Sequence, residues 1–348
     1  MSPRRLGILL LLAAAVGLGA WWLHRPHQAP RDAQLGTLLL PGLAPKLDAI
    51  TAVRLVGAGN QPLVTLERHD ASWRVRESDY AADAVKVRRL LIALSELKVA
   101  ESKTAEPARY AALGVEDPAT AGATSTRVEL DGAGQPMALI VGRSSGAQGS
   151  FVRAPGAAQS FLVRPALDLA KAPHDWLVRG FLDIAAARIA SVEVARAGEP
   201  AWEAQRAERN AAHFTVPQLP KGKELTSAGA ADPAGSAFGS LEFDEVRALA
   251  PAAAGAKRHR VTVRCYDGLT VALGSDAGGD AHWVSVEARY DPALAARFAA
   301  AAPKDAPGAE QVQKEAAGIT AVVAGHEYKI PNYRFDGIFR PLKELLRK

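Results

Sequence analysis

The feature that most constrains the fold is an order of short alternating segments that occurs twice along the chain. Apolar side chains recur at matching positions in residues 50–56 and 189–195, and Ile189 follows Ile50 by 139 residues. Alternation with a period of two is typical of a strand with one buried face. Three more strand-like pairs follow in the same order, namely residues 127–130 and 260–263, 140–142 and 272–274, and 151–152 and 283–284. We therefore expect two duplicated units.

Turn signals separate these segments. Asp131-Gly132 and Asp267-Gly268 follow the matched segments 127–130 and 260–263. Asp-Gly favours a hairpin because both residues tolerate a positive φ. Residues 66–68 with 72–75 predict a further hairpin, and residues 204–206 with 213–216 predict its counterpart.

Helical patterns interrupt the strands. Asp83 can cap a helix whose apolar face carries Val87, Leu90, Leu91, Leu94 and Leu97. Residues 107–113 predict a short helix closed by Gly114, and residues 341–348 predict a C-terminal amphipathic helix. This order predicts an α+β fold, in which each unit has an antiparallel sheet with helices packed on one face.

The N-terminus predicts a membrane anchor. Leu6 to Leu23 is a run of 18 residues without charge or proline, which as a helix is ~27 Å long, close to the thickness of a hydrocarbon core. Arg4 and Arg5 precede the run, which keeps the N-terminus in the cytoplasm and the bulk in the periplasm. Trp21 and Trp22 suit the membrane interface, so we favour an uncleaved single-pass signal anchor over a cleaved signal peptide.

These patterns divide the chain into five parts. We expect a cytoplasmic tip, a transmembrane signal anchor, a linker, a first periplasmic α+β unit, and a second one that ends in the C-terminal helix. Their bounds are residues 1–5, 6–23, 24–48, 49–185 and 186–348.

Composition excludes several classes of protein. A net charge of +5 over 348 residues is too small to indicate a nucleic-acid partner. The single cysteine, Cys265, excludes an intramolecular disulfide and a cysteine-built metal site, and its strand parity predicts a core position. The eight histidines form no metal motif, so no metal or cofactor is expected.

One motif has a catalytic interpretation. Gly142 to Gly146 matches the G-x-S-x-G pattern of a nucleophile elbow, with Ser144 as the nucleophile and Asp168 and His174 downstream in suitable order. An elbow requires a following helix, whereas strand-like residues 151–153 follow here. We therefore interpret the motif as a hairpin turn, matched by Gly274 to Gly278, and keep a serine hydrolase using Ser144 as the lesser alternative.

Three surface features have both a structural and a functional interpretation. Residues 257–260 are a basic run, which is either a solvated loop or a site for an anionic glycan or lipid headgroup. Glu242, Asp244 and Glu245 form an acidic counterpart, which is either a solvated surface or a binding patch. The aromatic residues Tyr328, Tyr333 and Phe335 either pack on a sheet or anchor a partner. Gly274 to Asp280 resembles a phosphate loop only faintly, because it lacks the Lys-Ser/Thr pair.

Several of these segments resemble the bacterial membrane-anchored proteins of the domain-of-unknown-function 4340 family. The resemblance lies in the hairpin ending in residues 72–75, the leucine helix after Tyr80, residues 110–118, and the connector 175–177 with residues 182–184 and Ile189. It covers about Ile50 to Val284. Some members are encoded beside, or fused to, ABC-type transport components, so the resemblance implies an accessory role in the envelope. It implies no catalytic residue.

Together these observations predict a non-enzymatic periplasmic accessory or interaction protein. It would be held in the inner membrane through Leu6 to Leu23 and would contact a protein partner in an ABC-type transport or envelope complex. The alternative is a module that binds a glycan or lipid through a cleft between the halves. The parts needed for catalysis are not evident in the sequence.

Overall fold

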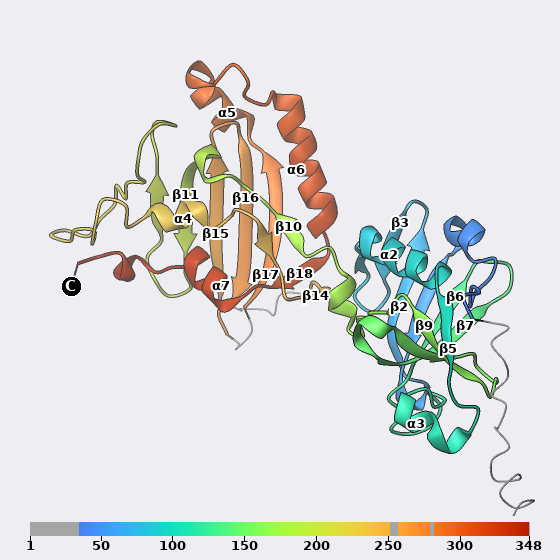
Figure 1. Ribbon diagram of the computed structural model, residues 1–348. Helices are drawn as coiled ribbons and strands as arrows, with labels where there is room; N and C mark the ends of the chain where they lie inside the picture. Colours follow the sequence, from blue (N-terminus) through green and yellow to red (C-terminus); the bar gives the residue numbers. More distant parts are fainter. Residues whose placement is uncertain (1–34, 251–256, 279–281, 348) are drawn as a thin grey trace, which may run out of the picture. The chain divides into compact units, whose positions relative to one another are not determined.

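The described residues form two units, each built around its own sheet (Figure 1). The computed structural model describes residues 35–250, 257–278 and 282–347. The first unit comprises the chain up to Trp73 and Ala84–Ala172, and the second comprises Arg74–Asp83 and Pro173–Lys348. The expected boundary at residues 185 and 186 is therefore too late, because the connector already pairs within the second unit: Leu177 lies opposite Ala82 in a β-bridge.

The predicted anchor, Leu6 to Leu23, lies outside the described residues. Within the described ranges, no helix combines the length and the apolar character that crossing a bilayer requires. The expected linker, residues 24–48, needs a correction at its end. Leu38 forms a β-bridge with Lys98. A 3-10 helix, η1, covers Ala44–Ala49. The first unit therefore begins before residue 49.

The first unit contains most of a long, largely antiparallel sheet, whose outermost strand, β4, falls within Arg74–Asp83, and a single long helix, α2 (Ala84–Ser95). Its strands follow the order β4-β3-β2-β1-β6-β7-β8-β9-β5. The strands are β1 (Ala52–Val56), β2 (Pro62–His69), β3 (Ser72–Val75), β4 (Tyr80–Ala81), β5 (Lys98–Ser102), β6 (Thr126–Asp131), β7 (Met137–Ser144), β8 (Ser150–Arg153) and β9 (Ser160–Arg164). A short helix, α3 (Tyr110–Leu113), lies between β5 and β6.

The second unit contains a seven-stranded sheet and a two-stranded one. The larger sheet has the order β12-β11-β15-β16-β17-β18-β14, and the smaller one pairs β10 with β13. The strands are β10 (Gly180–Leu182), β11 (Ile189–Ala195), β12 (Trp202–Gln205), β13 (Leu241–Glu242), β14 (Glu245–Ala248), β15 (Arg258–Cys265), β16 (Leu269–Asp276), β17 (Trp283–Tyr290) and β18 (His326–Lys329). The helices are α4 (Asp232–Ser236), α5 (Pro292–Phe298), α6 (Ala309–Val323) and α7 (Asn332–Ile338). Figure 1 shows α6 running alongside β17.

The two large sheets share one order over seven strands. In the first unit β2-β1-β6-β7-β8-β9-β5 are neighbours in that order, and β12-β11-β15-β16-β17-β18-β14 repeat it in the second. Each matched pair of segments expected from the sequence supplies a corresponding pair of strands, as β1 and β11 do. The α+β class with antiparallel sheets is confirmed.

The helices agree with the sequence pattern where that pattern was strong. In α2, Val87, Leu90, Leu91 and Leu94 are buried, as expected. Gly114 closes α3 with a φ of 67°, which is the left-handed conformation expected at this position.

The expected C-terminal helix is wrong. Only a 3-10 turn, η8 (Leu342–Glu344), forms there. The following backbone is used in pairing instead, because Leu346 forms a bridge with Leu225 and the N–H of Thr226 donates to the carbonyl of Leu345 at 2.9 Å. The alanine-rich helix α6 was not expected from the sequence, although Val312, Ala316 and Val323 lie on its buried side.

Candidate functional site

An apolar groove on the first unit is the strongest candidate for a binding site. It has a volume of about 1160 Å³ and lies where the described chain begins. We call residues 35–39 the entry segment, and the cavity beside it the entry groove. Apolar side chains from several elements line it, including Leu35, Leu38, Ala44, Leu47, Ile92, Val99 and Pro165.

The entry groove presents apolar surface to solvent. Leu35 and Leu38 are each 41% exposed and Ile92 is 36% exposed. Large apolar side chains gathered around one groove are typical of a site that another molecule covers. Charged groups border it: Glu96, Lys98 and Arg164 also line the groove. Among the described residues, neither Glu96 nor Lys98 has an ion-pair partner.

The second unit holds a convergence of charges at another cavity, of about 450 Å³. Arg188 donates to Asp267 through Nε at 2.5 Å and to both carboxylate oxygens of Glu315 through its terminal nitrogens, at 2.7 and 2.6 Å. Burial alone would lower the pKa of Arg188, but the hydrogen bonds to Glu315 and Asp267 raise it well above its ordinary value. The charges of Arg188, Asp267 and Glu315 are satisfied within this network, so we interpret the network as stabilising the fold and not as a binding site.

Arg209 lies beside that network and lines the same cavity. Its guanidinium lies over the ring of Tyr266 at 4.6 Å from the centroid. Its Nε is buried, and within the described part of the chain the side chain has neither a hydrogen bond nor an ion pair. Arg209 also lines an adjoining cavity of about 530 Å³, together with Phe298 and Pro303. A buried donor without a partner costs ~1–3 kcal/mol, so a bound group that accepts from it would be favoured.

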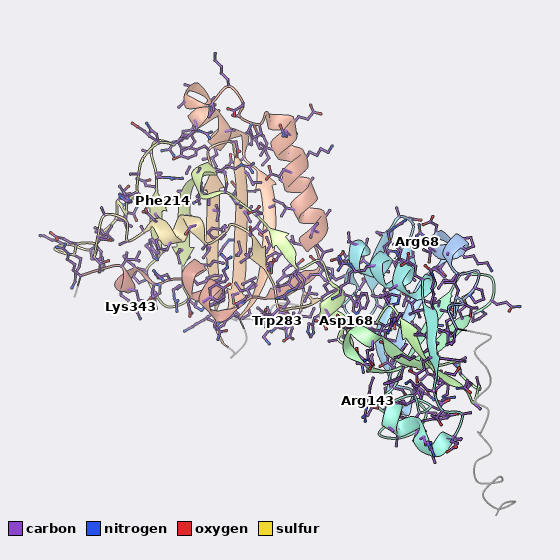
Figure 2. The ribbon with its side chains drawn as sticks, in the orientation of Figure 1. Arg68, Arg143, Asp168, Phe214, Trp283 and Lys343 are labelled. Carbon is purple, nitrogen blue, oxygen red and sulfur yellow. The ribbon has the colours of Figure 1, made fainter. Side chains whose placement is uncertain are left out.

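Ser144 lies in a hairpin turn. It ends β7 and pairs with Ser150 of β8, and a 3-10 turn (Gly146–Gln148) takes the place that a helix holds in a nucleophile elbow. Its Oγ accepts a hydrogen bond from the N–H of Gly146 at 3.2 Å, and no His or Asp among the described residues bonds to it. Figure 2 places the neighbouring Arg143 at the α3 end of the first unit.

The two charged runs are largely paired. Arg258 bonds to Asp276 on the adjacent strand β16 at 3.0 Å, and Arg260 bonds to Glu287 on β17, one strand further, at 3.0 Å, so these members of the basic run connect strands of one sheet. Asp276 also belongs to the segment Gly274 to Asp280, which resembles a phosphate loop only faintly. Asp280, at the end of this segment, lies outside the described residues.

The acidic counterpart is paired in the same way. Asp244 pairs with Arg179 at 3.0 Å and Glu245 with Lys329 at 2.6 Å, while Glu242 is exposed. Among the described residues, only Lys257 of the basic run and Glu242 of the acidic run are exposed without an ion-pair partner, so neither run gathers several free charges at one place.

The aromatic residues near the C-terminus divide between core and surface. Tyr328 is buried and stacks on Phe181 with ring centroids 4.3 Å apart. Burial raises the pKa of the Tyr328 hydroxyl, and the neighbouring Tyr80 raises it further. Phe335 is also buried, whereas Tyr333 is 70% exposed. Of the three expected anchors, Tyr333 is therefore the one that a partner could reach.

Cys265 occupies the core, as its strand parity predicted. The side chain is fully buried, and burial raises the pKa of its thiol to about 12. A thiol with this pKa is inert at neutral pH. Across the described residues, His, Cys, Asp and Glu form no group of three or more that could hold a metal ion.

Neither the entry groove nor Arg209 was predicted from the sequence. Leu35 and Leu38 belong to a segment expected to be a linker, and Arg209 lies in a loop without a motif. The pair of leucines three residues apart was the available signal for the groove, since linkers are usually polar. No local signal marks Arg209, because its position over Tyr266 depends on the tertiary fold.

Comparisons with known proteins identify the family. The family described as "Domain of unknown function (DUF4340)" matches residues 73–258, a narrower range than the expected resemblance from Ile50 to Val284. No curated protein matches the chain. No solved structure matches it either. Since the match spans more than half of the 348 residues, the chain belongs to the DUF4340 family.

Proposed function

We propose that this chain is a non-enzymatic accessory protein of the bacterial envelope. It is anchored in the inner membrane through Leu6 to Leu23, with its bulk in the periplasm, and it holds a protein partner from an ABC-type transport or envelope complex. The observation that carries the proposal is the entry groove, with Leu35, Leu38 and Ile92 partly exposed around it.

The position of the groove along the chain favours a membrane-bound partner. Only residues 24–34, 11 in all, separate the proposed anchor from Leu35. A fully extended chain of that length reaches ~40 Å at most. The groove is thereby kept close to the bilayer, and tethering raises its effective concentration near other membrane proteins. We therefore propose that the occupant is a membrane-proximal apolar segment of an integral membrane protein.

The shared strand order supports duplication. We propose that the two units descend from one ancestral unit, because seven strands follow the same order in both. After duplication, the two copies were free to diverge in their surfaces. The entry groove belongs to the first copy and the Arg209 cavity to the second.

Site-specific photo-crosslinking in intact cells tests the groove. A photoreactive residue at Ile92, which lines the groove, is compared with one at Arg89, which is exposed on the same helix and does not line it. We expect a membrane protein to be crosslinked at position 92 and not at position 89. Recovery of only the bait at both positions would contradict the proposal.

A second candidate function is the binding of a small ligand in the second unit. The specific observation is Arg209, whose guanidinium has no hydrogen-bond or ion-pair partner among the residues that the structure describes, beside the apolar wall formed by Phe298 and Pro303. This combination suits a carboxylate or phosphate with an apolar body, such as a lipid-derived anion. Native mass spectrometry of the protein purified from membranes should show a retained mass that Arg209→Ala loses. A clean apo mass for the unsubstituted protein would exclude this function.

A further inference from the structure

The entry segment leaves one backbone edge open. The N–H of Val99 donates to the carbonyl of Thr37 at 3.0 Å, and the N–H of Leu39 donates to the carbonyl of Leu97 at 2.7 Å. Between these two bonds lies Leu38, opposite Lys98. Alternate residues of an antiparallel pair direct their backbone groups to opposite sides, so the N–H and C=O of Leu38 point away from β5. In the described chain, no backbone group bonds to either of them.

The second unit contains an equivalent segment. In the first unit the entry segment leads through η1 into β1, and in the second unit residues 176–182 lead through a 3-10 helix (Ala186–Arg188) into β11. Each of the two segments pairs with the extended residues that come shortly after a helix. Leu38 pairs with Lys98 after α2, and Gly180 pairs with Glu242 after α4.

In the second unit, the edge of this segment is occupied. Ala82 lies opposite Leu177 in an antiparallel bridge. The N–H of Asp83 donates to the carbonyl of Trp176 at 2.7 Å, and the N–H of Val178 donates to the carbonyl of Ala81 at 3.1 Å. Residues 81–83 thus add to this edge as a short extra strand. Leu177, beneath them, is only 6% exposed, whereas Leu35 and Leu38 are each 41% exposed.

The added strand also brings a buried aromatic side chain with it. Tyr80, next to it in sequence, packs its ring edge-on against Phe243 at 5.4 Å and against Tyr328 at 5.9 Å between centroids. Phe243 lies directly after β13, the strand that pairs with β10. One extended segment therefore forms backbone hydrogen bonds along an edge and covers apolar side chains at the same time.

We infer that the entry groove binds an extended segment of a partner protein, which adds as a strand to the open edge at Leu38 and inserts an apolar side chain into the groove. The occupant follows from the second unit, where the chain's own residues 81–83 occupy the same edge at Trp176 and Val178. These two residues come shortly before Gly180, the counterpart of Leu38. In strand addition, backbone bonds provide affinity and side-chain pockets provide selectivity. A helical ligand could not use the N–H and C=O of Leu38, because its own backbone groups are already paired. This inference rests on the proposed function and specifies how the partner binds.

Two substitutions at one position separate backbone from side-chain recognition. Leu38→Pro removes the outward N–H, and proline is tolerated where an edge N–H faces solvent. Leu38→Ala is the matched control, since it shortens the side chain and keeps the N–H. Both are combined with the photo-crosslinker at Ile92 in full-length protein in intact cells, and thermal unfolding of the purified variants checks their fold.

We expect Leu38→Pro to reduce the crosslinked product on the order of tenfold, the effect of about one lost hydrogen bond in a desolvated site. Leu38→Ala should reduce it clearly less. Equal reduction by both variants would overturn strand addition and leave the proposed function standing. Product unchanged in both variants would overturn the inference together with the groove as the docking site.

A second measurement covers the case in which Leu38→Pro fails to fold. Hydrogen–deuterium exchange of the unsubstituted protein is compared before and after crosslinking at Ile92. Strand addition predicts that the amide of Leu38 becomes protected in the crosslinked product. An unprotected Leu38 amide in that product would overturn the inference, and protection would support it without any substitution.

Discussion

Arg188 holds the carboxylate of Glu315 with two parallel hydrogen bonds, of 2.7 and 2.6 Å, across 127 residues of sequence. The pair joins the turn before β11 to helix α6. The second partner of Arg188, Asp267, follows β15, so one guanidinium connects three elements of the second unit. Bidentate pairs of this kind are stronger and more directional than single ones.

Removing the charge of Glu315 should destabilise the second unit. Glu315→Gln leaves half-buried Arg188 with one carboxylate instead of two, and we expect a loss of ~1–3 kcal/mol in the free energy of unfolding. Urea denaturation measures it. Glu310→Gln is the control, because Glu310 is exposed on the same helix. Similar unfolding midpoints for the two variants would show that the network contributes little.

Two glycines should respond to alanine in opposite directions. Gly268 has a φ of 91°, and a Cβ there would lie 2.6 Å from the carbonyl oxygen of Asp291, so Gly268→Ala should destabilise by more than ~1 kcal/mol. Gly318 lies inside α6, and a Cβ added to it would have no neighbouring atom within 4 Å, so Gly318→Ala should stabilise by up to ~1 kcal/mol. Thermal unfolding of both variants tests the pair, and the same sign for both would contradict this explanation.

Cys265 should react only when the protein unfolds. Its thiol is fully buried with a pKa of about 12, so alkylation at pH 8 should be negligible in the native protein and should follow the urea unfolding curve. The readout is unambiguous because the chain has a single cysteine. The neutral thiol is favoured in the folded state, so its contribution to stability should be lost as the pH rises from about 9 toward 12. Rapid native labelling would place Cys265 near the surface instead.

Glu129 should make the first unit sensitive to acid. Burial alone would raise the pKa of this carboxyl, but hydrogen bonds from Arg54 at 3.0 Å and Arg127 at 2.7 Å lower it below its ordinary value. The stabilisation is therefore present above the unfolded pKa of ~4.3 and is lost as the pH falls through the folded pKa. Glu129→Gln should be less stable at pH 7 and should lose less stability than the unsubstituted protein on acidification. Urea midpoints at several pH values measure this, and parallel pH profiles would refute it.

The proposed topology predicts where a fused reporter works. Alkaline phosphatase joined after Lys348 should be active, because it folds only in the oxidising periplasm, and a fluorescent reporter that folds only in the cytosol should be dark. Replacing three leucines of the run Leu6 to Leu23 by Asp should reverse both results, since charges in a span prevent insertion. Activity of the cytosolic reporter alone would refute the envelope assignment.

Local patterns in the sequence predicted much of the fold. Alternation located β1 and β11, Asp-Gly located the turns at Gly132 and Gly268, and the spacing of Val87, Leu90 and Leu94 located α2. Each of these signals lies within a few residues, where side-chain period and backbone φ decide the structure. The core position of Cys265 followed from the same period.

The tertiary structure decided the candidate sites. The entry groove exists because Leu38 pairs with Lys98, which is distant in sequence, beside a helix that contributes Ile92. Arg209 becomes notable only because it lies over Tyr266 and, among the described residues, has no acid as a partner. The spacing of Leu35 and Leu38 gave only a weak local signal, and nothing in the local sequence distinguishes Arg209 from an ordinary surface residue. The positions of these side chains depend on contacts between segments that are distant in sequence. The local period of apolar residues does not indicate which surfaces stay uncovered after the distant segments have packed.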